Sequence, residues 1–411
     1  MKRFVIIGLL FHQLKRELDG AIVEKVVPHL QKYNLVGEVA IVSDAGSALG
    51  KDLVKQLHGM NATVVMGCAD VHMDWCSQLA ANICETEEPS EHDNSDCMSR
   101  LIPLSLDLAE VDSVEAFSAT LHDSLAHLRT DYLVLNGDTD RFTERVTKQG
   151  HDITFGAVYL GQLLLVQLLR DRLLAAVPLT TTGAPLHAPG LDNLDEFAYR
   201  ESKANAASRV VFVGSSSSLY GDIEPSLLHG AAEQFFRNTG GLNAAHFALT
   251  MSAFELQRGV DVAAEANSLN MGQVKSRRMV TSVVNSGYMS LHKSTIMAMV
   301  SRYVLRSVSE SNHVVLYAML SNNYVPSSYI DSYLIGHDLF NYHADVTTTH
   351  LVAYPSARTL KFNLPDPDGV FRSQSGNIED WYFKLRGDKY DYRLLAGKLW
   401  KASAAVLGKD F

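Results

Sequence analysis

Short apolar runs alternate along the chain with longer stretches in which apolar residues recur at helical spacing. Short runs rich in β-branched residues are typical of buried parallel strands, and apolar positions three and four residues apart are typical of amphipathic helices. The runs that predict strands are residues 39–42, 63–66, 101–106, 132–135, 209–213 and 260–264. Helices are predicted between them, the longest of them over residues 151–174. This order predicts an α/β fold: a doubly wound, Rossmann-like parallel sheet with helices on both faces.

The same pattern divides the chain into a central domain with additions. We predict an N-terminal helical arm over residues 1–35, with apolar residues at helical spacing. The Rossmann-like domain then covers residues 36–300, with insertions at 85–99 and 176–208, the first of them acidic and polar. Residues 301–411 are expected to complete this domain and to add an extension that caps it or contacts a partner.

Composition excludes some functions and restricts others. The net charge of −10 and the pI of about 5.9 leave no basic surface of the kind that binds the phosphate backbone, so nucleic acid is not an expected partner. The four cysteines form no Cys-x-x-Cys pair, which predicts thiols in a reducing compartment rather than a metal site.

No stretch reaches the ~20 apolar residues that a membrane-spanning helix needs. Residues 4–11 are an apolar segment within the arm, and two interpretations are open. The segment packs on its own domain, or it docks on a membrane surface or a partner protein.

Residues 38–50 have the order that holds a dinucleotide pyrophosphate: a strand, a turn of small residues, and a helix. Backbone N–H groups bind the phosphates in such a turn, and glycines allow the close approach. Here Asp44 and Ala48 stand where glycine is wanted, and Asp44 adds a carboxylate that would repel a pyrophosphate.

Several motifs resemble the short-chain dehydrogenase/reductase family, in the branch of retinol dehydrogenases and the WW-domain oxidoreductase. The segments that carry the resemblance are residues 35–42 (LVGEVAIV), Asp107-Leu108, residues 155–161 (FGAVYLG) and residues 395–403 (LAGKLWKAS). The match runs from about Leu35 to the C-terminus. The resemblance implies NAD(P) as cofactor, held in the family at the positions of Ser43, Asp44, Gly50, Asp107, Leu108 and Asn136.

The chain departs from the family at most of its cofactor positions. The Thr-Gly-x-x-x-Gly-x-Gly turn becomes Ser43, Asp44, Ala48 and Gly50, so that only the last glycine remains. The other replacements are Ala69 for an arginine that favours NADP, Leu135 to Asp138 for Asn-Asn-Ala-Gly, Val158 for a proton-relay asparagine, and Asn267-Ser268 for Pro-Gly.

The catalytic positions are also changed. The family uses a tyrosine as proton donor, a lysine one helical turn later, and a serine that orients the carbonyl. Ser215 keeps the serine, whereas aligning residues 254–256 places Leu242 at the tyrosine and His246 at the lysine. A second register gives His229 and Glu233, and neither register supplies the pair.

Tyr199 and Lys203 form a literal Tyr-x-x-Ser-Lys. This motif precedes the fifth strand, inside the 176–208 insertion, whereas the family's pair follows that strand. An exposed helical turn is the simpler interpretation, and a catalytic pair reached through an unusual chain path is the alternative.

These changes predict a pseudoenzyme: a dehydrogenase fold without catalysis, serving as a structural or accessory subunit of a larger protein complex. No cofactor is expected, or NAD(P) if there is one, and no metal. The alternatives are an NAD(P)-dependent oxidoreductase and a non-catalytic dinucleotide sensor. A mitochondrial membrane complex is the favoured location, with peripheral membrane contact through the arm, and the cytoplasm is the alternative.

Overall fold

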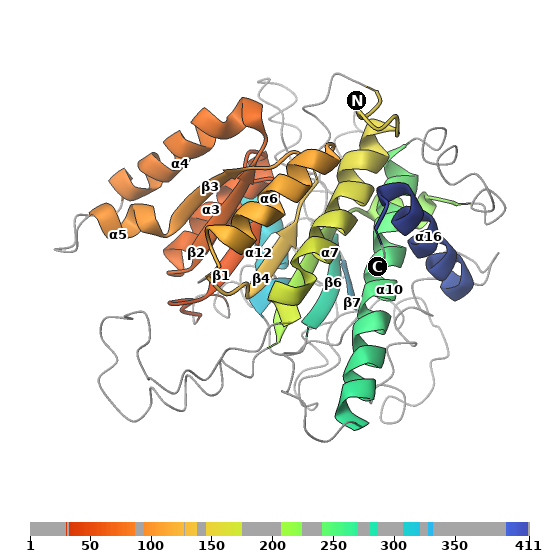
Figure 1. Cartoon of the computed structure of the whole chain (residues 1–411). Coiled ribbons are helices and arrows are strands. Elements are labelled where there is room, and N and C mark those ends of the chain that lie inside the picture. The colour runs from red at the N-terminus through yellow and green to blue at the C-terminus, as the bar shows by residue number, and fades with distance from the viewer. Residues whose placement is uncertain are drawn as a thin grey trace, which may run out of the picture.

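A single parallel sheet organises the part of the chain that the structure describes. The computed structural model describes residues 30, 33–86, 94–126, 128–137, 145–174, 207–223, 241–269, 279–285, 307–320, 328–331 and 392–409. Seven parallel strands stand in the order β3-β2-β1-β4-β5-β6-β7 (Figure 1). They are β1 (Val39–Val42), β2 (Thr63–Cys68), β3 (Leu101–Ser105), β4 (Tyr132–Leu135), β5 (Ser208–Gly214), β6 (Met279–Asn285) and β7 (Ser328–Asp331). The predicted doubly wound α/β fold is confirmed.

Strand β1 marks the point where the strand order reverses. It pairs with β2 on one side, with Val42 opposite Met66, and with β4 on the other, with Val42 opposite Val134. Open α/β sheets bind ligands at the carboxyl ends of the strands beside such a point. The segments that follow β1, β2 and β4 therefore form the candidate site.

Helices cover both faces of the sheet. One face carries α3 (Ala48–Gly59), α4 (Met73–Thr86), α5 (Asn94–Ser99) and α12 (Val308–Leu320). The other carries α6 (Val111–Asp123), the π-helical segment η3 (Phe155–Leu160) with its continuation α7 (Gly161–Leu174), α10 (Leu242–Leu269) and α16 (Tyr392–Leu407). Figure 1 shows α6, α7, α10 and α16 in front of the sheet and α12 behind it. Each layer buries its own apolar cluster, as two-faced parallel sheets require.

The sixth strand is not where the sequence pattern placed it. Residues 260–264 lie inside helix α10, and strand β6 is Met279–Asn285. The alternation of Val260, Asp261 and Val262 imitates a strand, but the Val262 side chain is 61% exposed. Met279–Asn285 is buried along its whole length between β5 and β7, and this burial selects it as the strand. The alignment of Pro-Gly with Asn267 and Ser268 is therefore wrong, since both positions are helical.

The prediction of free thiols is also wrong. Cys68 forms a disulfide with Cys76, and Cys84 forms one with Cys97. Their Cα atoms lie 6.7 Å and 5.8 Å apart, within the range that a disulfide can bridge. Helix α4 packs against both β2 and α5, and so brings together cysteines whose spacing forms no motif. The argument for a reducing compartment therefore fails, because disulfides persist mainly in oxidising ones.

Some predicted features lie outside the described residues. These are the arm except Leu30 and residues 33–35, most of the 176–208 insertion with Tyr199 and Lys203, and the second-register pair His229 and Glu233. Among the described helices, none is long and apolar enough to cross a membrane.

Candidate dinucleotide site

The carboxyl ends of β1 and β4 are joined by reciprocal hydrogen bonds. The Ser43 hydroxyl donates to the Asn136 carbonyl oxygen and accepts from the Asn136 backbone N–H, both at 2.9 Å. The Asn136 side-chain amide then donates to the Ser47 hydroxyl at 2.7 Å. The structure thus brings together Ser43 and Asn136, two of the positions at which the resemblance places the cofactor. Their polar groups are bonded to each other.

Ser47 caps the helix that follows the turn. Its hydroxyl accepts from the Gly50 N–H at 3.0 Å and donates to the Asp44 carbonyl oxygen at 2.9 Å. A serine at this position stabilises a helix N-terminus by roughly 1 kcal/mol. A Cβ at Gly50 would lie only 2.0 Å from the Asp44 carbonyl oxygen, so the turn itself requires this glycine. The one family glycine that remains is therefore explained by packing alone.

The turn is closed by side chains of the chain itself. Asp44 is only 2% exposed, at the position where the family has glycine. Gly46 lies directly against His72, because a Cβ at Gly46 would fall 2.8 Å from the His72 Nδ1 atom. His72 belongs to η2 (Asp70–His72), which begins after Ala69 at the end of β2. Sequence reasoning missed His72, since no motif links it to a turn 26 residues earlier.

Two further interactions hold the segment after β2 in place. The Cys68–Cys76 disulfide joins the last residue of β2 to helix α4 and so spans η2. The Lys51 ammonium group, in the first turn of α3, lies 3.4 Å from the centre of the Trp75 ring. This cation–π contact holds the Lys51 charge against α4. The charge is therefore not directed at an anion at the N-terminus of α3.

Asp107 and Leu108 follow β3, where the resemblance predicts contact with adenine. The Asp107 carboxylate accepts from the Ala109 N–H at 2.9 Å, and the Asp107 N–H donates to the Ser113 hydroxyl at 2.8 Å. Leu108 is buried and presents its carbonyl oxygen to Gly161 at the start of α7. Both residues have a clear structural role in the turn between β3 and α6.

The end of β5 and the start of α10 lie side by side. The Ser215 hydroxyl accepts from the Ser217 N–H at 3.2 Å, at the start of η4 (Ser216–Tyr220). A Cβ at Gly221 would fall 2.1 Å from the Asn243 carbonyl oxygen, so η4 packs tightly on the first turn of α10. The chain thus keeps the strand-end serine next to the helix start.

Leu242 and His246 occupy the first turns of that helix. Leu242 is the first residue of α10 and is 44% exposed. His246, one turn later, is buried, and burial lowers its pKa to about 4. The imidazole is therefore neutral at pH 7, because an uncharged ring costs less to bury than a cation. No cation stands at this position to activate a neighbouring proton donor.

Comparison with known proteins agrees with this architecture. No family model matches the chain. Human retinol dehydrogenase 13 is 27% identical over 176 residues, which cover 42% of this chain and 49% of that protein. The human WW domain-containing oxidoreductase is 30% identical over 151 residues, 36% of this chain and 33% of that protein. The chain thus matches half or less of the length of these relatives.

A solved structure has a similar fold. A crystal structure of an uncharacterized protein from Mycobacterium paratuberculosis, 17% identical, aligns with a TM-score of 0.52 over 93% of this chain and 98% of its own. The predicted resemblance to the retinol-dehydrogenase branch of the short-chain dehydrogenase/reductases is confirmed by these relatives, which match 42% and 36% of this chain.

The family's long helix begins here with a π-helical turn. Residues Phe155–Leu160 form η3, and Val158 within it is fully buried at the position of the family's proton-relay asparagine. The Gln162 amide is also buried, and neither of its polar atoms has a hydrogen-bond partner among the described residues. Its Nε2 atom would lie 2.3 Å from a Cβ at Gly137, just after β4. Val158 offers no group that could pass a proton.

Tyr159 is a polar contact in the core that sequence reasoning missed. Its hydroxyl bonds to the hydroxyls of Ser252 in α10 (2.9 Å) and Ser403 in α16 (2.7 Å). Burial raises the pKa of Tyr159 to about 12 despite these bonds. A phenol held this way joins three helices and stays protonated at neutral pH. The family-like segment at residues 155–161 predicted a helix here, but it did not predict the hydrogen bonds of the Tyr159 hydroxyl.

Proposed function

We propose that this chain is a catalytically inactive relative of the short-chain dehydrogenases that acts as a structural or accessory subunit of a larger assembly. The observation that carries the proposal is the pair Leu242 and His246 on α10. Hydride transfer in the family needs a phenol that moves a proton and a cation that lowers the pKa of this phenol. Leu242 has no proton to give, and the buried His246 is neutral because its pKa is about 4.

The residues at the pyrophosphate position support the same proposal, because they do not fit a dinucleotide held in the family's manner. The N-terminus of α3 could attract an anion through its backbone N–H groups. However, the Asp44 carboxylate is buried in the turn, and His72 lies against Gly46 where a ligand would approach the backbone. We therefore derive no chemical step through NAD(P).

The first test is a titration of the full chain with NADH and NADPH, followed by cofactor fluorescence and calorimetry. We expect no saturable signal at cofactor concentrations up to about 1 mM, which corresponds to a binding free energy weaker than about −4 kcal/mol. The variant Asp44→Gly/Ala48→Gly restores the glycines of the turn. If this variant binds NADH or NADPH more tightly than the wild type, these two replacements account for the weak cofactor binding of the wild type. Asp44→Asn is the matched control, since it removes the charge and keeps the side-chain volume.

Two results of the titration would favour the alternatives. Micromolar binding without turnover of an aldehyde such as retinal would favour a dinucleotide sensor. Binding with turnover, lost in Tyr199→Phe, would favour an oxidoreductase that uses Tyr199 and Lys203. Either result would contradict the proposal that the chain is inactive and binds no cofactor.

The second test concerns the assembly. The chain alone has a mass of 45.3 kDa. In the source cell, we expect the tagged full chain to migrate on a native gel well above this mass, in the mitochondrial membrane fraction and with fixed protein partners. Deleting residues 4–11 tests the apolar arm segment as a docking element. Migration at the mass of the free chain, before and after mild cross-linking, would contradict the role as a subunit.

A further inference from the structure

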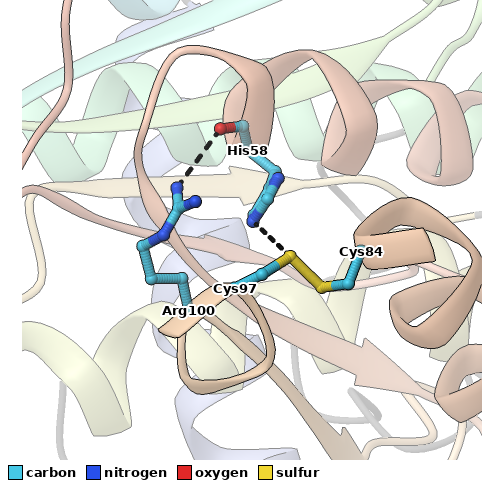
Figure 2. The surroundings of a disulfide bond; sticks show 4 residues. All are labelled: His58, Cys84, Cys97 and Arg100. Atoms are coloured by element: carbon cyan, nitrogen blue, oxygen red, sulfur yellow. Dashed lines mark hydrogen bonds between the residues drawn. A yellow bond between two sulfur atoms is a disulfide. The ribbon is translucent and has the colours of Figure 1, made fainter. Parts of the chain in front are cut away.

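Three metal-ligating side chains meet where helices α3, α4 and α5 lie close together. His58 stands in the last turn of α3, Cys84 near the end of α4, and Cys97 in α5. Figure 2 shows the His58 ring directed at the disulfide between the two cysteines. One ligand atom from each residue lies within 4.8 Å of the other two, and all three residues are buried. The described residues hold no second group of this kind.

The His58 ring is buried against the disulfide. His58 is only 1% exposed, and its Nε2 atom lies 3.5 Å from the Cys97 sulfur. The His58 backbone is fixed separately, because its carbonyl oxygen accepts from the Asn61 N–H at 2.8 Å and from the Arg100 guanidinium at 3.5 Å.

We propose that the chain binds a zinc ion at this place when the Cys84–Cys97 disulfide is reduced. Two thiolates and one imidazole are ligands that zinc prefers, and three protein ligands leave a fourth tetrahedral position for water or an external thiol. The bridged form would then be the metal-free state. The site is independent of the proposed function, because it lies at the C-terminal end of α3 and not at the turn before it.

The reaction requires a dithiol reductant. The dithiol attacks one sulfur of the bridge through a mixed disulfide, its second thiol completes the exchange, and the reductant leaves as a cyclic disulfide. The two electrons gained leave Cys84 and Cys97 as thiols. Zinc then displaces one proton from each thiol, so binding releases two protons and weakens as the pH falls. An oxidising disulfide reverses the exchange and releases the metal.

The second disulfide provides a matched control within the same chain. Cys68 and Cys76 are also buried and bridged, but the described residues place no third ligand with them. Reduction therefore produces two pairs of thiols. Among the described residues, only the pair Cys84 and Cys97 has a histidine side chain, His58, within ligand distance. Selective metal binding at one pair distinguishes a built site from thiols that bind metal without preference.

The test uses Co²⁺ as a spectroscopic substitute for zinc. The full chain is reduced with excess dithiothreitol, and the reductant is then removed under anaerobic conditions. The reduced chain is titrated with Co²⁺. We expect one equivalent to give a thiolate-to-cobalt charge-transfer band and tetrahedral d–d bands, both removed by added Zn²⁺. The same titration of the oxidised chain should give no band.

Variants identify the ligands. His58→Gln keeps the disulfide and should weaken Co²⁺ binding by more than the roughly 10–100-fold that loss of an outer-shell partner costs. Cys84→Ser should abolish the charge-transfer band, whereas Cys68→Ser/Cys76→Ser should keep it. An absent band in the reduced chain, or equal affinity in His58→Gln, overturns the proposal. If reduction unfolds the chain, Co²⁺ present during reduction should restore the helical circular dichroism signal in the wild type but not in His58→Gln, and failure to do so also overturns it.

Discussion

Replacing Gly161 with alanine should lower the free energy of unfolding by about 3 kcal/mol or more. Gly161 begins α7, and a Cβ at this position would fall 1.9 Å from the Leu108 carbonyl oxygen. Overpacking usually costs about 1–3 kcal/mol, and here no side-chain rotation can relieve the collision, because the opposing atom is backbone of a buried residue. Urea unfolding followed by circular dichroism measures the change.

Gly259→Ala is the matched control, because it is also a helical glycine changed to alanine. Nothing lies within 4 Å of a Cβ at Gly259, which is exposed in the middle of α10. Since alanine is favoured over glycine in a helix by roughly 1 kcal/mol, this variant should be slightly more stable than the wild type. Equal stability of the Gly161→Ala variant and the wild type would contradict the close contact between α7 and the end of β3.

Acidification from pH 7 to pH 4 should cost the native state about 3 kcal/mol through His246 alone. The pKa of His246 is lowered from 6.5 to about 4 because burial disfavours the cation. Above pH 6.5 the ring is neutral in both states and the stability is complete. Between pH 6.5 and 4 the unfolded chain binds a proton that the folded chain does not, so the free energy of unfolding falls with the pH. The side chain is only 7% exposed, so solvent screening reduces this figure little.

His246→Gln should flatten the dependence of stability on pH between 6.5 and 4, whatever its effect on stability at pH 7. His313, whose pKa burial also lowers, remains in both proteins and accounts for part of the residual slope. An unaltered slope in His246→Gln would show that the ring is charged or solvated in the native state. The argument that no cation activates a proton donor at this site would then need revision.

The sequence predicted the frame of the candidate site well. Strand β1, the turn through Asp44 and Gly50, strand β4 and the helix over residues 151–174 were all expected and are present. Ser43 and Asn136 were both expected at the cofactor site, and the structure joins them by reciprocal hydrogen bonds. Each of these features depends on a contiguous pattern of residues or on the fixed rule that neighbouring parallel strands end at one edge of the sheet.

Other features required the folded chain. Residues 260–264 and 279–285 are both short apolar runs, and only burial between two strands decided which of them is β6. The same holds for the pairing of the four cysteines and for His72 lying on Gly46. The sequence by itself thus determined the fold class and the places of the first five strands, and it predicted the loss of the family's catalytic residue types. The tertiary structure decided which distant side chains fill the turn, which sulfurs join and which histidine lies beside them, because these depend on contacts between segments that no local periodicity records.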